Sequence, residues 1–214
     1  MMKSFSKNQL QRYPIYLKYF KSLSDEGVVD ISSPKIAKEL GYSEEQIRKD
    51  LQAVSDEAGR PKKGRNVHKL IETLEGFLGY RDSTTAVIIG CGHLGGALLN
   101  YPNFDEMGLS IIAGFDVDSQ KIGTMMGGKE IFPLDKLSNL LPRLNAHIAI
   151  VTVPVGAAQE VVDTAIASGA LAIWNFAPTH INVPSNIVIE NVNLASSLAV
   201  LSHRLNATLS KEEK

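Results

Sequence analysis

The pattern of hydrophobic and polar residues changes near residue 82. Before it, apolar residues recur at mostly helical spacing in three short segments, 8–23, 32–41 and 42–54. After it, short apolar runs rich in β-branched residues alternate with segments of helical pattern. Such alternation predicts a parallel sheet with right-handed crossovers. The chain is therefore predicted to carry a helical N-terminal module and an α/β C-terminal module.

The N-terminal segments contain helix start and stop signals. Pro14 predicts a start or a kink in the first helix. In "SSPKIAKELG", Ser33 precedes Pro34 as a cap, and a glycine ends the segment. Ser43 and Gln46 give "YSEEQIRKDLQAV" the S-x-x-Q form of a capping box. Two short helices joined by the tight "LGYS" connection predict a helix-turn-helix, with a plain helical hairpin as the alternative.

The C-terminal module contains five apolar runs that read as strands: "TAVIIG", "LSIIAGFDVD", "AHIAIVTVP", "ALAIWNFAP" and "NIVIENV". "CGHLGGALLNY" follows the first run as a helix, and "GAAQEVVDTAIASG" separates the third from the fourth. The predicted fold class is α/β, with a Rossmann-type doubly wound parallel sheet after the helix-turn-helix.

Composition restricts the class of protein. The chain has 214 residues, 44% of them hydrophobic, and its apolar runs are too short to span a bilayer. The N-terminus lacks an apolar signal core, so a cytoplasmic protein without membrane contact is expected. A single cysteine, Cys91, rules out an intramolecular disulfide.

Charge is divided unevenly along the chain. Residues 1–70 hold 14 Lys and Arg against 9 Asp and Glu, whereas the remainder holds 8 against 14. A basic module on an acidic body indicates a polyanionic partner at the N-terminal end.

Several residues of the basic module suit contacts with double-stranded DNA. The first turns of the predicted recognition helix, 44–54, offer polar and cationic side chains to base edges and phosphates. "GRPKKGR", 59–65, follows where a winged helix carries its wing, and Arg60 would enter an A·T-rich minor groove. A solvated loop is the alternative for this stretch. The predicted DNA-binding residues are Ser33, Lys35, Ser43, Gln46, Arg48, Lys49, Arg60, Lys62, Lys63 and Arg65.

A glycine loop predicts the ligand of the second module. Gly90, Gly92 and Gly95 have G-x-G-x-x-G spacing after an apolar strand, and Asp116 follows Gly95 by 21 residues. This context is that of a dinucleotide fingerprint, in which the acid accepts from the adenosine ribose hydroxyls. A carboxylate there would repel a 2′-phosphate, so NAD(H) is preferred to NADP(H). The alternative is a Rossmann-like sheet with an altered site.

Two further loops at strand ends could border the nicotinamide, or could be ordinary turns. The predicted cofactor-binding residues are Gly90, Cys91, Gly92, His93, Leu94, Gly95, Tyr101, Asp116, Val117, Asp118, Thr152, Val153, Pro154, Asn175, Phe176 and Ala177. His180 is the one plausible catalytic histidine, and no separate substrate domain remains. The sequence thus favours a nucleotide sensor over a dehydrogenase, with no catalytic residue and no metal site assigned.

Six stretches occur in order between residues 32 and 205, within a match that runs from about residue 10: "SSPKIAKELGYSEEQIRKDL", "GCGHLGGALLNYPNF", "GFDVDSQKIG", "VTVPVGAAQEVVD", "NFAP" and "VPSNIVIENVNLASSLAVLSHRL". Together they resemble the Rex family of redox-sensing transcriptional repressors. The resemblance implies a winged helix-turn-helix at 1–82, a Rossmann NAD(H) domain at 83–190, and a C-terminal helix at 191–214 swapped onto a second subunit. It also implies a homodimer, and that NADH generally releases the DNA. Because a two-fold dimer would present two wings, the expected operator is an inverted repeat with A·T-rich flanks.

The chain departs from the family pattern at two places. After "RKDL", a more basic "QAVSDEAGRPKKGRNV" replaces the family's Ser-Tyr-Phe-Gly run and Arg-Gly wing. The family's switch pairs an arginine of the N-terminal helix with an aspartate near the swapped helix, and Lys18 and Asn193 hold those positions here. A Lys–Asn pair lacks opposite charges, so a weaker NADH response is expected. Tyr101 matches the family tyrosine near the nicotinamide.

Two other functions stay open at this point. The "TVP" and glycine-loop arrangement is similar to the CoA-binding domains of acyl-CoA ligases, so a CoA-responsive regulator is the alternative, although those domains carry no helix-turn-helix. A small NAD-dependent oxidoreductase would be recognised by turnover.

Overall fold

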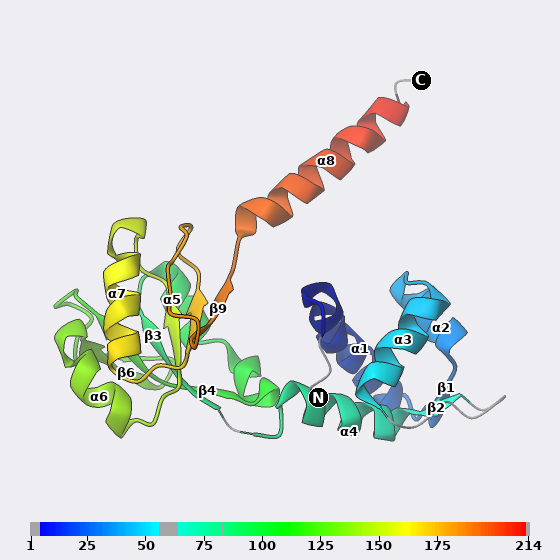
Figure 1. Ribbon diagram of the computed structural model, residues 1–214, viewed down its shortest axis with the longest axis horizontal. Helices are drawn as coiled ribbons and strands as arrows, with labels where there is room; N and C mark the ends of the chain where they lie inside the picture. Colours follow the sequence, from blue (N-terminus) through cyan, green and yellow to red (C-terminus); the bar gives the residue numbers. More distant parts are fainter. Residues whose placement is uncertain (1–4, 56–63, 83, 213–214) are drawn as a thin grey trace. The chain divides into compact units, whose positions relative to one another are not determined.

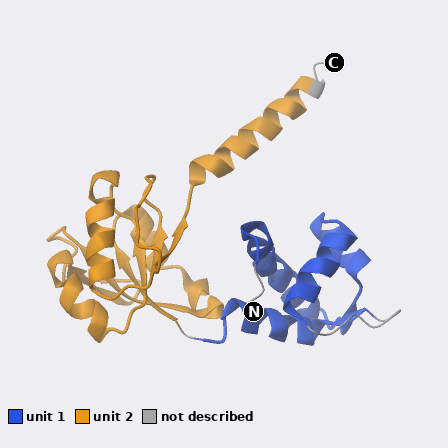
Figure 2. Cartoon of the chain, viewed as in Figure 1, with its two compact units in different colours: residues 1–82 blue, residues 83–214 orange. Residues whose placement is uncertain are grey.

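The computed structural model of the chain describes residues 5–55, 64–82 and 84–212, and side chains as far as residue 210. The chain divides into two compact units, residues 1–82 and residues 83–214 (Figure 2). Each unit has its own hydrophobic core, so each is described by itself.

The first unit is helical, with one short antiparallel strand pair. Its elements are α1 (Lys7–Asp25), β1 (Asp30–Ile31), α2 (Ser33–Leu40), α3 (Glu44–Val54), β2 (Arg65–Asn66) and α4 (Val67–Leu78) (Figure 1). Aromatic side chains of α1 form the centre of the core, where Tyr13, Tyr16 and Phe20 are fully buried. Apolar residues of the other helices, including Ile36, Ile47 and Leu74, complete the same cluster.

The helix boundaries confirm the predicted start of α3 and correct the other two. Ser43 Oγ accepts from the amide of Gln46 at 3.2 Å, and α3 runs over the expected residues. The predicted cap of α2 was wrong by one residue, because Ser32 is the N-cap and Ser33 is already helical. Pro14 does not start α1, which begins seven residues earlier because the Ser6 side chain caps it by accepting from Gln9. The proline ring faces solvent inside the helix, where water can satisfy the carbonyl that loses its partner.

β1 and β2 form the described base of the predicted wing. Ile31 pairs with Arg65, and Asp30 pairs with Asn66, in antiparallel register. Gly64 enters β2 with a φ of +82°, and a Cβ there would overlap the carbonyl of Ile31. The predicted wing residues Arg60, Lys62 and Lys63 lie outside the described residues.

The second unit is a seven-stranded sheet with the order β5-β6-β4-β3-β7-β8-β9. Every neighbouring pair is parallel except β5 with β6. Apart from β5, this order is the 3-2-1-4-5-6 arrangement of the Rossmann fold. The strands are β3 (Thr84–Ile89), β4 (Leu109–Asp116), β5 (Met125–Met126), β6 (Lys129–Pro133), β7 (Ile148–Val151), β8 (Ala172–Asn175) and β9 (Val188–Asn191).

Alternate residues of the central strands feed two separate cores. Val87 and Ile89 face α6 (Leu137–Arg143) and α7 (Val155–Ala167), whereas Ala86 and Ile88 face α5 (His93–Leu99) and the 3₁₀ helix η1 (Pro102–Met107). All four side chains have zero exposed area. A strand buried on both faces explains why "TAVIIG" reads as a continuous apolar run.

The sequence pattern did not reveal three other elements of this unit. β6, the short 3₁₀ helix η2 (Leu134–Lys136) and α6 follow one another within residues 129–143. Pro133 ends β6 and Pro142 lies inside α6, so two prolines interrupt the hydrophobic periodicity here.

The chain ends in α8 (Leu194–Glu212), drawn in orange to red after β9 in Figure 1. Its side chains from Leu194 to Ser210 are all exposed. The exposed residues include Leu194, Leu198, Leu201, Leu205 and Leu209, each with about half or more of its area open to solvent. In the ranges that the structure describes, no helix combines the length and the apolar character needed to cross a membrane.

Candidate functional site

The strand register aligns the predicted nucleotide residues at one edge of the sheet. Ile89 at the end of β3 pairs with Phe115 of β4 and with Val151 of β7. The next residues, Gly90, Asp116 and Thr152, therefore lie at the same level. Strand order reverses between β4 and β7 on either side of β3, which is where open α/β sheets bind their ligands.

The three glycines of the loop serve different purposes. Gly90 has a φ of +94°, and a Cβ there would lie 2.9 Å from the carbonyl oxygen of Thr152. A Cβ on Gly95 would overlap the carbonyl of Gly90 and lie 2.8 Å from Thr152 Oγ1, which itself donates to that carbonyl at 2.6 Å. A Cβ on Gly92 would meet nothing within 4 Å. Packing thus requires glycine at positions 90 and 95, while Gly92 leaves open space for a bound group.

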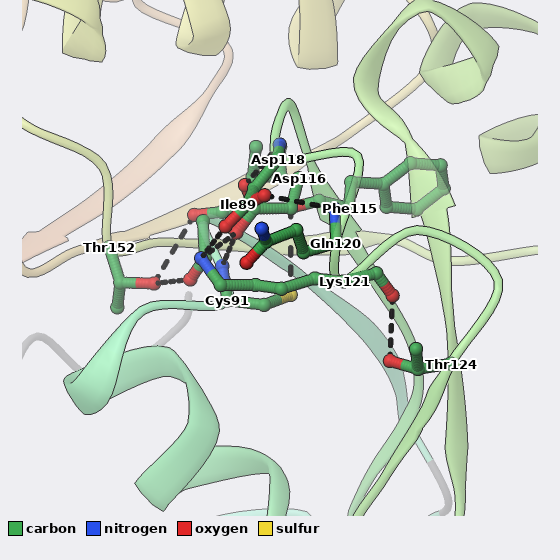
Figure 3. Close-up of polar contacts among 10 residues, drawn as sticks. Ile89, Cys91, Phe115, Asp116, Asp118, Gln120, Lys121, Thr124 and Thr152 are labelled. Atoms are coloured by element: carbon green, nitrogen blue, oxygen red, sulfur yellow. Dashed lines mark hydrogen bonds and ion pairs between the residues drawn. The ribbon is translucent and has the colours of Figure 1, made fainter.

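Asp116 is held at the end of β4 by donors from the protein (Figure 3). Its Oδ2 accepts from the amide of Cys91 at 2.7 Å and from Lys121 Nζ at 3.3 Å, and its Oδ1 accepts from the amide of Asp118 at 2.9 Å. Burial raises the pKa of Asp116, but the two amides and the Lys121 ammonium outweigh it, so the pKa lies below its ordinary value. The carboxylate is therefore ionised and 8% exposed.

Cys91 is buried between the loop and β4. Its Sγ lies 3.6 Å from the carbonyl oxygen of Phe115, and the residue is 1% exposed. Burial, together with the nearby Asp116, raises the pKa of the thiol to about 11. The side chain is a neutral filler, and Cys91 can offer a ligand only its backbone. By contrast, His93, Leu94 and Val117 of the predicted set are exposed.

The predicted nicotinamide side combines a rigid loop with a row of aromatic rings. The Asn175 side chain is 1% exposed; its Nδ2 donates to Asn191 Oδ1 at 2.9 Å, and its Oδ1 accepts from the amide of Ala177 at 2.9 Å. Asn175 therefore shapes the loop rather than presenting free donors. Val153 is half-buried, and Pro154, the N-cap of α7, is exposed.

The aromatic row leads from η1 to the end of β8. Tyr101, 44% exposed, packs edge-on against Phe104 with ring centroids 4.9 Å apart. Phe104 contacts Trp174 at 5.8 Å, and Trp174 contacts Phe176 at 5.0 Å. The structure thus joins two predicted cofactor residues, Tyr101 and Phe176, through two rings that sequence reasoning did not single out.

The predicted DNA residues of unit 1 lie mainly on α3. Arg48 and Lys49 are exposed, and each forms an ion pair one turn back along the helix, Arg48 with Glu44 and Lys49 with Glu45. Pairs of this kind contribute little to stability and can exchange for phosphate. Lys35 is exposed, Ser33 is half-buried, and Arg65 lies half-buried in β2.

A buried charge pair fixes α3 to α1. Arg12 Nε and Nη2 donate to the two oxygens of Asp50 at 2.7 and 2.9 Å, and the Tyr16 hydroxyl donates to the same carboxylate at 2.8 Å. The Arg12 and Asp50 side chains are 15% and 4% exposed. Hydrogen bonding to Asp50 raises the pKa of Arg12. With its amide oxygen turned toward the guanidinium, Gln46 accepts from Arg12 at 3.1 Å.

The two predicted switch residues lie in different units. Lys18 is exposed on α1. Asn193 Oδ1 accepts from the amide of Ser196 at 3.1 Å and so caps the first turn of α8. Within the described ranges, no three His, Cys, Asp or Glu side chains gather closely enough to hold a metal ion.

Sequence reasoning missed Lys121, Trp174 and the Arg12–Asp50 pair. One signal could have revealed Asp50: it lies on the same face of the predicted helix as the apolar Ile47 and Leu51, which is the face that becomes buried. A carboxylate on a buried face needs a partner. Lys121 follows Asp118 by three residues, a spacing that allows an ion pair.

Comparisons with known proteins cover both units. A family described as "Putative DNA-binding protein N-terminus" matches residues 5–52, and one described as "CoA binding domain" matches residues 81–179. The redox-sensing transcriptional repressor Rex of Bacteroides fragilis is 41% identical over 197 residues, which cover 92% of this chain and 89% of that protein.

Solved structures extend the likeness to the whole fold. RSP, a Rex-family repressor, in complex with β-NAD+ and operator DNA matches with a TM-score of 0.90 and 31% identity, covering 99% of this chain and 97% of RSP. RSP in complex with β-NADH matches with a TM-score of 0.88 and 32% identity, covering 99% and 100%. The predicted family and fold class are thereby confirmed: the chain belongs to the Rex family of redox-sensing transcriptional repressors.

Proposed function

We propose that this protein is a transcriptional repressor that senses the balance of NADH and NAD+. The observation that carries the proposal is the presence, in one chain, of a helix-turn-helix whose second helix exposes Arg48 and Lys49 and of a glycine loop whose Cys91 amide holds Asp116. The likeness to RSP, which is solved with β-NAD+ and operator DNA and with β-NADH, supports it. A repressor of this kind would act in the cytoplasm, where its DNA lies.

The residues at the sheet edge fit a dinucleotide. The open space at Gly92 would admit the diphosphate, and Asp116 would accept from the adenosine ribose. Tyr101, Thr152 and Phe176 would border the nicotinamide, which supplies the redox sensitivity when bound. The remaining predicted cofactor residues, among them Asn175, whose side chain holds the loop after β8, would form the surroundings of the nucleotide. The match to a CoA-binding family makes CoA the second candidate ligand.

The proposed DNA interface consists of α3 and the wing. Arg48 and Lys49 would reach the major groove or its phosphates, because they are exposed on α3, and Gln46, half-buried beside Arg12, would reach base edges from the first turn of the helix. Arg60, with Lys62, Lys63 and Arg65, would contact the minor groove and its flanking phosphates. Two such interfaces, related by a two-fold axis, would fit an A·T-rich inverted repeat.

The exposed leucines of α8 support a homodimer. Leu194, Leu198, Leu201, Leu205 and Leu209 recur at three- and four-residue intervals, which places them on one stripe of the helix. A contiguous apolar stripe of this length on a solvent-exposed helix indicates that a second subunit covers it. We therefore assign residues 191–214 to dimerisation. Replacing Leu198 and Leu205 with serine should yield monomers in analytical ultracentrifugation, and an unchanged dimer mass would contradict this assignment.

The decisive experiment follows operator binding of the full-length protein during titration with NAD+, NADH and CoA. We expect NADH to lower the affinity for an inverted-repeat operator, NAD+ to preserve it, and CoA to have no effect. Asp116→Ala should weaken NADH binding by about 1–3 kcal/mol, whereas Asp135→Ala, which removes an exposed carboxylate of η2, should not. A response to CoA without a response to NADH would favour the second candidate. Turnover of a nicotinamide substrate would indicate an enzyme instead.

A further inference from the structure

Lys121 forms a compact charge cluster with the two acids that follow β4. Its Nζ lies 3.3 Å from Asp116 Oδ2 and 3.3 Å from Asp118 Oδ2 (Figure 3). The Lys121 side chain is 32% exposed, and that of Asp116 is 8% exposed. The cluster therefore carries two negative charges and one positive charge at the place where the adenosine ribose would bind.

The cluster leaves Asp116 little capacity for further hydrogen bonds. An ionised carboxylate offers about four lone-pair sites. Protein donors occupy two on Oδ2, from Cys91 and Lys121, and one on Oδ1, from Asp118. The open site is on Oδ1, so a ribose hydroxyl bound there shares the carboxylate with the Lys121 ammonium on Oδ2, and Nζ lies near a substituent on that hydroxyl.

We infer that Lys121 sets the limit of nucleotide selectivity, by giving the ribose subsite a partner for a 2′-phosphate. The inference rests on the proposed binding of NAD(H) by this unit, and it extends the ligand class to NADP(H). Asp116 alone would repel the phosphate, whereas the ammonium of Lys121 can pair with it. NADH remains the better ligand, but NADPH binds with a smaller penalty than the aspartate alone would impose.

Lys121 is not needed to hold Asp116 in place. The amides of Cys91 and Asp118 anchor the two carboxylate oxygens at 2.7 and 2.9 Å, and both belong to the backbone. Replacing the lysine should therefore leave the geometry for NADH intact. This separates a role in selectivity from a role in supporting the loop.

The test compares the dissociation constants of NADH and NADPH by calorimetry on the full-length protein. Lys121→Met should raise the NADPH-to-NADH ratio of these constants about 10- to 100-fold, the effect of one charge-assisted hydrogen bond. Lys121→Arg keeps the charge and should leave the ratio within about threefold. Lys136→Met removes an exposed cation of η2 in the same unit, and it controls for the effect of losing one positive charge away from the ribose subsite.

Three outcomes would overturn the inference. An unchanged ratio in Lys121→Met, with NADH still bound, would defeat it and leave the proposed function standing. An equal loss of affinity for both nucleotides would show that Lys121 only supports the loop. A parent protein that binds neither nucleotide would refute the proposed function, and this inference with it.

Discussion

Removal of the Asp50 carboxylate should destabilise the first unit and loosen the contact between α1 and α3. Asp50→Ala leaves the Arg12 guanidinium without its bidentate partner and the Tyr16 hydroxyl without an acceptor. Breaking a buried ion pair on one side costs about 3–5 kcal/mol. Because 15% of the Arg12 side chain is exposed and can be hydrated, we expect the lower end, about 3 kcal/mol.

This loss is large for a unit of this size. One kcal/mol shifts the melting temperature of a 60–100-residue domain by about 4–8 °C, so the transition of residues 1–82 should fall by about 12–24 °C. Thermal unfolding of the full-length variant, followed by far-UV circular dichroism, measures the shift. Hydrogen exchange read by mass spectrometry assigns it to peptides of residues 1–82.

Two control variants sharpen this test. Asp50→Asn keeps a carbonyl acceptor of the same shape and should cost about half as much as alanine, roughly 1.5 kcal/mol. Asp25→Ala removes an exposed carboxylate from the end of α1 and should change stability by no more than about 0.5 kcal/mol. If Asp50→Ala costs less than about 1 kcal/mol, or if the asparagine variant is no milder, the charge pair does not stabilise this unit as we argue.

Three further outcomes follow from other parts of the chain. Burial raises the pKa of Cys91 to about 11, so iodoacetamide at pH 8 should label the folded protein at least about 100-fold more slowly than the unfolded chain; a difference below tenfold would contradict this. Replacing Glu44 and Glu45 with glutamine frees the two cations paired with them and should steepen the salt dependence of DNA binding by up to about two in slope; an unchanged slope would place these residues away from DNA. Asn193→Ala should destabilise α8 by about 1 kcal/mol, whereas Asn193→Asp should not, and equal hydrogen exchange of α8 in both variants would exclude the cap.

The elements that could be predicted are those in which one local rule decides the outcome. The run at residues 86–89 is buried on both faces, so every position must be apolar whichever helices pack against it. The Ser43 cap depends on a partner three residues away, and the structure forms that bond. The spacing of Gly90, Gly92 and Gly95, with Asp116 downstream, likewise predicts a nucleotide-binding loop without any knowledge of tertiary contacts.

The features that could not be predicted depend on partners far away in sequence. Arg12 and Asp50 are 38 residues apart, and nothing local indicates that they meet. Asn175 was predicted to bind the nucleotide, but its side chain donates a hydrogen bond to Asn191 of the neighbouring strand. Lys121 is different, because its partners Asp116 and Asp118 are only five and three residues away, but the turn after β4 that brings its ammonium back to Asp116 has no pattern in the sequence.

Trp174 gives the protein an internal optical probe. It is the chain's single tryptophan, it lies in β8 one residue before Asn175, and its ring is 5.0 Å from that of Phe176. Reduced nicotinamide absorbs at the wavelengths at which tryptophan emits, whereas the oxidised ring does not. Energy transfer from this one indole would therefore quench its emission more strongly when the protein binds NADH than when it binds NAD+. The oxidation state of the bound nucleotide could then be followed in real time on the unlabelled protein, with every tryptophan photon coming from one known position.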